Sequence, residues 1–81
     1  MLKDKVLVNL YILKLDKKYE IYLPVNEKIG NIIALLERQL FSNAQEASNS
    51  VLLNLNSGAF YNYNDIVRNL DIKNETNLML I

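Results

Sequence analysis

The sequence predicts an α+β domain in which a mixed sheet of four to five strands packs on one helix. Apolar residues alternate along the opening and closing segments, as in strands, and recur at steps of three and four residues over 29–40, as on a buried helix face. The chain has 81 residues, 51% of them apolar and 22% charged. It therefore holds enough apolar side chains for one small core, and we expect a single domain over 1–81.

The first two predicted strands form a hairpin. Residues 5–15 predict a strand that is apolar on both faces, with Val6, Val8, Leu10 and Ile12 on one of them. Polar residues 16–18 mark a short turn, and 19–23 predict a second strand. Strands joined by so short a turn pair antiparallel. Pro24 should end the second strand, because proline has no N–H to donate to a neighbouring strand.

A change of period after Pro24 predicts a helix over roughly 27–41. Asn26 is the expected N-cap, and Gly30 is expected to allow a close approach of the helix to the sheet. Replacing Leu36 in the buried stripe by Ala is expected to destabilise the fold by about 2–5 kcal/mol. The stripe consists of Ile29, Ile32, Ile33, Leu36 and Leu40.

The second half of the chain predicts shorter elements. A polar loop over 42–50 precedes a strand over 51–55 and a short strand over 59–61. Asn64 and Asp65 are expected to cap a short helical turn over 66–70, and the last strand is expected over 77–81. Because the first and last strands are long and apolar, both should lie side by side in parallel at the centre of the sheet.

This order of elements is that of the β-grasp, and two stretches carry a family resemblance. The stretch 67–81, VRNLDIKNETNLMLI, resembles the ending of ubiquitin. The strand–proline–helix run of 19–24 and 29–36 is similar to the YukD (EsaB-like) family, small bacterial ubiquitin-like proteins associated with type VII secretion. The resemblance implies a ubiquitin-like β-grasp fold. It also implies an accessory or regulatory role in the cytoplasm, with a type VII secretion membrane component as a candidate partner.

Composition argues against catalysis, cofactors and a membrane span. The chain has no histidine and no cysteine, so it lacks imidazole bases, thiolate nucleophiles and the usual zinc ligands. Asp65 and Asp71 could suggest a metal pair, but helix capping and turn formation explain them better. No apolar run approaches the roughly twenty residues that cross a bilayer. We therefore expect a cytoplasmic, non-enzymatic protein without cofactor or metal and without direct membrane insertion.

Two other functions stay open as alternatives. A carrier or modifier acts through a flexible C-terminal Gly-Gly, whereas this sequence ends at Leu80-Ile81, so that reading requires processing of a longer chain. A small RNA-binding domain would stack bases on Tyr11 and Tyr22 beside the lysines of the hairpin tip. Nine basic residues balance nine acidic ones, so the chain lacks the usual electrostatic attraction to nucleic acid, and we expect no nucleic-acid partner.

The predicted functional surface is the face of the sheet that the helix leaves uncovered. A single helix covers one face, so apolar side chains on the other face should be exposed, and exposed apolar patches often mark interfaces. The alternative is that the 42–50 loop covers some of them, or that Leu7 and Leu13 pack at the sheet edges. The partner is another protein or a second copy of the chain. The predicted protein-binding residues are Leu7, Tyr11, Leu13, Tyr22, Leu52, Met79 and Ile81.

Overall fold

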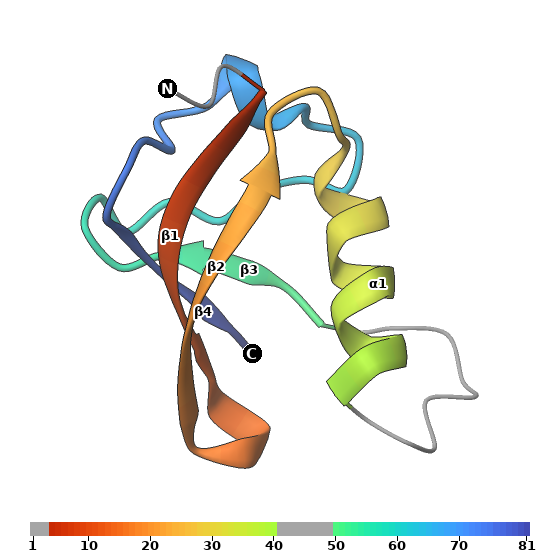
Figure 1. The fold of residues 1–81 in the computed structure, drawn as a ribbon, viewed down its shortest axis with the longest axis vertical. Coiled ribbons are helices and arrows are strands. Elements are labelled where there is room, and N and C mark those ends of the chain that lie inside the picture. Colours follow the sequence, from red (N-terminus) through yellow and green to blue (C-terminus); the bar gives the residue numbers. More distant parts are fainter. Residues whose placement is uncertain (1–3, 41–49) are drawn as a thin grey trace.

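Strands from opposite ends of the sequence lie next to each other at the centre of the sheet (Figure 1). The computed structural model describes residues 4–40 and 50–81. In it, β1 (Lys5–Ile12) pairs in parallel with β4 (Thr76–Leu80), and Tyr11 lies opposite Met79. Both strands also bury apolar side chains toward the helix. The predicted parallel pair at the centre of the sheet is confirmed by this pairing and by the strand order.

The two outer strands each pair antiparallel with a central one. β2 (Lys17–Pro24) pairs with β1, and β3 (Leu52–Asn54) pairs with β4, which gives the order β2-β1-β4-β3. The mixed sheet of the predicted α+β class is thus confirmed with four strands. The strand expected over 59–61 is reduced to one bridge between Leu53 and Phe60.

The turn between β1 and β2 comes earlier in the chain than predicted and spans four residues, 13–16, in place of the three predicted at 16–18. β1 ends at Ile12, and a 3-10 turn (Leu13–Leu15) follows in place of the last predicted strand residues. Asp16 closes this turn in the left-handed region, at a φ of 52°. Aspartate tolerates that region better than most residues, which explains why the chain reverses here. Of the loop predicted over 42–50, residues 42–49 lie outside the described residues.

Helix α1 (Ile29–Leu40) begins two residues later than predicted, and Asn26 is not its N-cap. The segment before it pairs with residues 66–68 instead: Lys28 bridges Ile66, and the Val67 N–H donates to the Glu27 carbonyl at 3.1 Å. The first helical N–H groups are satisfied by backbone carbonyls. Ile29 donates to Asp65 at 2.8 Å and Gly30 to Tyr63 at 2.9 Å.

Gly30 does allow a close approach, but to the turn that holds Tyr63 and not to the sheet. A Cβ atom at Gly30 would lie 3.1 Å from both the Cβ and the carbonyl oxygen of Tyr63. The short 3-10 helix η2 (Val67–Asn69) follows that turn. Ile66 precedes it and makes no side-chain cap, so the capping predicted for Asn64 and Asp65 is wrong.

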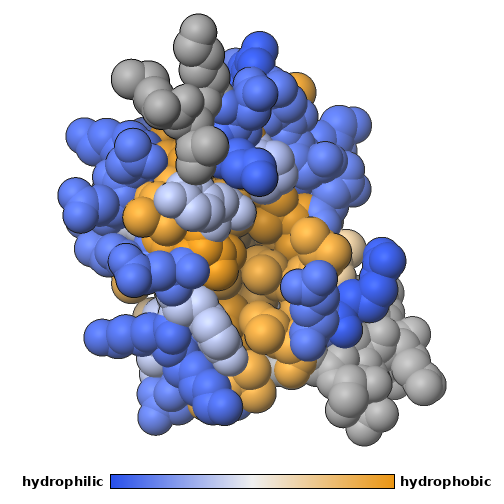
Figure 2. Space-filling view, viewed as in Figure 1, coloured by the Kyte–Doolittle hydropathy of each residue, from blue (hydrophilic) through white to orange (hydrophobic). Residues whose placement is uncertain are grey.

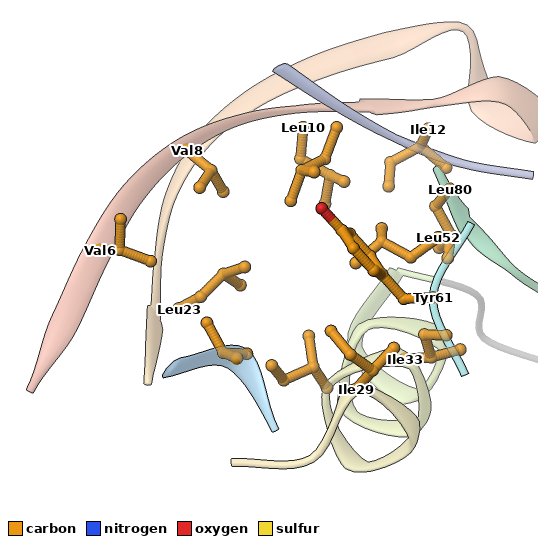
Figure 3. Close-up of a cluster of buried hydrophobic side chains, with 13 residues drawn as sticks. Val6, Val8, Leu10, Ile12, Leu23, Ile29, Ile33, Leu52, Tyr61 and Leu80 are labelled. Atoms are coloured by element: carbon orange, nitrogen blue, oxygen red, sulfur yellow. The ribbon is translucent and has the colours of Figure 1, made fainter. Parts of the chain in front are cut away.

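The core lies between α1 and the inner face of the sheet (Figure 3). Side chains of β1 point down toward Ile29 and Ile33 of the helix, and the ring of Tyr61 lies among them. Leu36 and Leu40 of the predicted stripe are only partly buried. One face of the sheet is therefore occupied by the helix, and no other helix or strand in the described ranges packs on the opposite face, which we call the open face.

Candidate functional site

The open face of the sheet is built from side chains that alternate with the core residues. In β1 the core residues are Val6, Val8, Leu10 and Ile12, and the residues between them point to the other side. The register sets Tyr22 beside Leu7 and Met79 beside Tyr11, so these four predicted residues share the open face.

An apolar row crosses this face from the centre of the sheet to its far edge. Tyr11 pairs with Met79, Met79 with Leu53, and Leu53 with Phe60. We call these four residues the outer apolar row. Phe60 is 63% exposed, and the other three are half-buried. Below the row, Val51 and Ile81 exchange two backbone hydrogen bonds of 3.0 and 3.1 Å, which extends the apolar surface by the predicted residue Ile81.

A polar row divides the open face, so the predicted residues do not form one patch. Asn9 lies between Glu20 and Asn77, and its Nδ2 atom donates to the Asn77 Oδ1 atom at 3.2 Å. Leu7 and the 54% exposed Tyr22 lie on one side of it, and the outer apolar row lies on the other. A shallow hollow of about 690 Å³ follows this division, with lining residues that include Asn9, Tyr11, Lys18, Glu20, Leu55 and Asn77.

Leu52 does not belong to the open face, and its predicted orientation is wrong. Its side chain is 1% exposed and lies in the core, while Leu53 takes the outward position opposite Met79. A strand has a side-chain period of two, so one residue of error exchanges its faces. Leu13 is exposed, but it lies in the 3-10 turn beyond β1 and belongs to the hairpin tip.

The orientation of β3 is explained by Asn54, a polar residue in the core. Its Oδ1 atom accepts the N–H groups of Asn56 at 2.8 Å and Ser57 at 3.2 Å, and its Nδ2 atom donates to the Tyr61 hydroxyl at 2.9 Å. These bonds offset the loss of water around the amide. Asn54 can therefore face inward, and Leu53 faces out.

Tyr61 and Asp71 complete this polar cluster. The Tyr61 hydroxyl donates to the Asp71 carboxylate. Burial, together with this hydrogen bond, raises the pKa of Tyr61 to about 12. The same bond lowers the pKa of Asp71, with a smaller contribution from Ser57. The pair holds a neutral phenol against a carboxylate and fixes the turn after β3 in place.

The ring of Tyr11 in the outer apolar row is held by a hydrogen bond at the hairpin tip. Its hydroxyl donates to the Asp16 carboxylate, and this bond raises the pKa of Tyr11. A tyrosine held in this way has little conformational freedom left in its ring.

The two carboxylates that could suggest a metal pair, Asp65 and Asp71, each accept a hydrogen bond from a neighbouring group. Asp65 accepts the N–H of Asn62 at 2.9 Å within its own turn, and Asp71 accepts the hydroxyl of Tyr61. Each carboxylate therefore makes its own local contact. Across residues 4–40 and 50–81, no group of three acidic side chains is placed to hold a metal ion. Among the described helices, none has the length and apolar character to cross a membrane.

Leu53 and Phe60 are the two residues of the outer apolar row that the sequence analysis missed. In the segment 51–55 every odd position is apolar and one even position is Asn54, so the alternation favours the odd positions in the core. The available signal was the polar pair of Asn54 and Tyr61, whose side chains can satisfy each other when both face inward.

Comparison with known proteins finds similar structures but no matching sequence family. No family model and no curated protein matches the chain. A chain from a structure described as molecular mimicry of SUMO that promotes DNA repair aligns over 100% of this chain and 95% of its own, with a TM-score of 0.79 and 14% identity.

Two further structures align over nearly the whole chain. The N-terminal ubiquitin-like domain of the 4931431F19Rik protein covers 96% of this chain and 74% of its own, with a TM-score of 0.73 and 17% identity. A chain of a toluene 4-monooxygenase complex covers 94% and 95%, with a TM-score of 0.73 and 5% identity. These likenesses show that the chain has the ubiquitin-like β-grasp fold.

Proposed function

We propose that the chain is a non-enzymatic protein-binding module and that the outer apolar row is its contact surface. The observation that supports this most directly is Phe60, a large apolar side chain that is 63% exposed and continuous with Leu53, Met79 and Tyr11. Large aromatic side chains of this kind are frequent at the centres of interfaces.

Binding would be driven by burial of this apolar area. Phe60 and Tyr11 supply rigid aromatic surface, and Met79 between them adapts its shape to a partner. The polar row of Glu20, Asn9 and Asn77 would form one rim of the interface and fix the orientation of the partner through hydrogen bonds.

For the partner, we propose a protein component of a bacterial type VII secretion system, with this chain in an accessory or regulatory role in the cytoplasm. The support is the resemblance of 19–24 and 29–36 to the YukD family. The neutral net charge fits a protein partner better than a nucleic acid.

The test is a single charged substitution in the outer apolar row, Phe60→Asp. Phe60 is exposed, so the variant should keep its circular dichroism spectrum, but it should bind the purified cytosolic domain of the secretion membrane component at least about tenfold more weakly than the wild type. Leu35→Asp is the matched control, because Leu35 is 50% exposed on α1, on the other side of the sheet.

Sedimentation of the same proteins without the partner tests self-association through the same face. Dimerisation that Phe60→Asp abolishes would keep the surface and replace the partner by a second copy. If Phe60→Asp and Leu35→Asp both behave like the wild type in binding and in sedimentation, the outer apolar row is not the interface.

A further inference from the structure

The turn between β1 and β2 projects from one end of the molecule, and we call its residues 13–18 the hairpin tip. Figure 1 shows this turn at the lower end of the longest axis, at the opposite end of β1 from the start of that strand. Figure 2 shows hydrophilic side chains gathered at the same end, with apolar ones beside them. The hairpin tip is therefore a convex end of the molecule.

An exposed leucine lies in the hairpin tip among three lysines. Leu13 is 47% exposed, whereas Leu15, the other leucine of the turn, is partly buried against the core. Lys14, Lys17 and Lys18 are all exposed. Six consecutive residues thus hold three of the nine basic side chains of the chain, together with one apolar side chain that contacts solvent.

The pairing of β2 with β1 places lysines on both faces of the hairpin tip. Lys18 lies opposite Tyr11, which is on the open face, and Lys17 lies opposite Ile12, which is in the core. Directly opposed residues of an antiparallel pair share a face of the sheet. The two lysines therefore extend to opposite sides of the hairpin, and the turn that holds Leu13 lies between the two strands.

The acidic residue of the hairpin tip is bonded within the hairpin. The Asp16 carboxylate accepts a hydrogen bond from the Tyr11 hydroxyl, so it is directed back toward β1. Three lysines and one aspartate leave a net charge of +2 on residues 13–18, although the whole chain has none. The hairpin tip is thus a local basic site on a neutral protein.

We propose that the hairpin tip binds the surface of an anionic lipid bilayer. A flat, negatively charged surface can contact a convex end from all of its sides, whereas an extended peptide needs a groove or a strand edge. The lysines would lie near the lipid phosphates, and Leu13 would reach the boundary between headgroups and acyl chains. The contact goes beyond the proposed function and does not depend on it.

The energetic terms are modest, so we expect weak and salt-dependent binding. A lysine near an anionic surface strengthens binding about fivefold. This attraction falls off within about 10 Å at 0.1 M salt. Lys5 lies at the far end of the eight-residue strand β1, beyond that range, so only the charges near the tip count. Leu13, which would leave water only in part, adds roughly threefold.

Co-sedimentation with lipid vesicles tests the proposal. At about 0.1 M salt and millimolar lipid, the wild type should sediment with phosphatidylcholine vesicles that contain about one third phosphatidylglycerol. It should not sediment with pure phosphatidylcholine, and about 0.5 M salt should release it. The double variant Lys17→Gln, Lys18→Gln should bind about twenty-fivefold more weakly.

The matched control is the double variant Lys5→Gln, Lys28→Gln. Both lysines are exposed, one at the start of β1 and one just before α1, and the net charge changes by the same amount. This variant should sediment as the wild type does. Circular dichroism of each variant confirms that the fold is kept.

A fluorescent probe tests the role of Leu13. The chain has no tryptophan, so Leu13→Trp adds a single indole at the hairpin tip. Its emission should move to shorter wavelengths on anionic vesicles, because the ring leaves water. Tyr22→Trp, at a 54% exposed position near the other end of β2, is the control and should not shift. Leu13→Ser should weaken sedimentation roughly threefold.

The inference is wrong if the wild type does not sediment with the anionic vesicles, or if both double variants lose binding equally. It is also wrong if Tyr22→Trp shifts and Leu13→Trp does not. A single-stranded RNA oligomer that binds the lysines where vesicles do not would assign the hairpin tip to nucleic acid. Phe60→Ser, in the outer apolar row, should sediment as the wild type does, so failure here is distinct from failure of the proposed function.

Discussion

Asn54 is a polar side chain in the core, and its three hydrogen bonds show how a single residue sets the direction of a strand. We expect Asn54→Leu to destabilise the protein by about 1–3 kcal/mol, because two backbone N–H groups lose their side-chain acceptor and the Tyr61 hydroxyl keeps only its bond to Asp71. Urea unfolding measures this. Asn62→Ala, at an exposed position, is the control and should change stability by less than about 0.5 kcal/mol. Equal stability of the two variants would contradict the role given to Asn54.

The burial of Tyr61 and its hydrogen bond to Asp71 predict a stability change at both ends of the pH scale. The pKa of Tyr61 is raised from 10.0 to about 12, so its contribution is full below the unfolded value and is lost as the pH rises toward 12. The pKa of Asp71 is lowered from 3.8, so its contribution is present above that value and is lost as the pH falls below it.

Tyr61→Phe removes the hydroxyl and with it both effects. Urea midpoints near neutral pH, at about pH 3 and at about pH 11 should show the wild type losing more stability than Tyr61→Phe in each direction. Parallel changes in the two proteins would mean that other groups govern the acid and alkaline transitions.

The residues of β1 and β2 that face the core were predictable from the sequence, because the alternation of side chains continues long enough in each strand to show which positions are buried. The three residues of β3 were not. Val51, Leu53 and Leu55 make the odd phase more apolar than the even one, which favours the wrong face. The hydrogen bonds of Asn54 to Asn56, Ser57 and Tyr61 determine which face of β3 is buried, and the pattern of apolar residues carries no information about such bonds.

At the level of elements, α1 buries its first two turns more deeply than its last. Ile33 is 1% exposed, so Ile33→Ala should cost about 2–5 kcal/mol. Leu36 is only partly buried, and Leu36→Ala should cost less than the 2–5 kcal/mol expected from the sequence, about 1–2 kcal/mol. Thermal unfolding of both variants would show the difference, and a larger loss at Leu36 would contradict this packing.

The apolar stripe was enough to predict that α1 exists, but it did not predict the residue at which α1 begins. Sequence signals for a helix start are side-chain caps, and Asn26 has the right chemistry for one. The first N–H groups of α1 are instead satisfied by carbonyls of Asp65 and Tyr63, which lie more than thirty residues away in the sequence. Backbone carbonyls exist at every position, so no residue pattern marks the ones that are used.

For the whole molecule, the topology was predictable because two strands are apolar on both faces and therefore belong at the centre. The open face was predicted correctly as a face but not as a continuous patch, because the polar row depends on the register between strands. The predicted binding role of the seven residues stays a prediction.

Neighbouring residues of β3 provide a test of this two-sided architecture. Leu52→Asp places a charge in the core and should leave the protein unfolded, whereas Leu53→Asp places it on the open face and should keep the fold. Far-ultraviolet circular dichroism and heat denaturation distinguish the two. Loss of structure in both variants would mean that the outer face is also covered.

The position of β4 between β1 and β3 also determines when the domain can fold during its synthesis. While a ribosome is still adding residues before 76, the hairpin of β1 and β2 has no partner on its inner edge, and β3 lacks its long neighbour. Without β4, the unpaired backbone groups of these strands can pair with other nascent chains. We therefore expect the domain to acquire its native structure only after β4 has been synthesised, and to depend on chaperones until then.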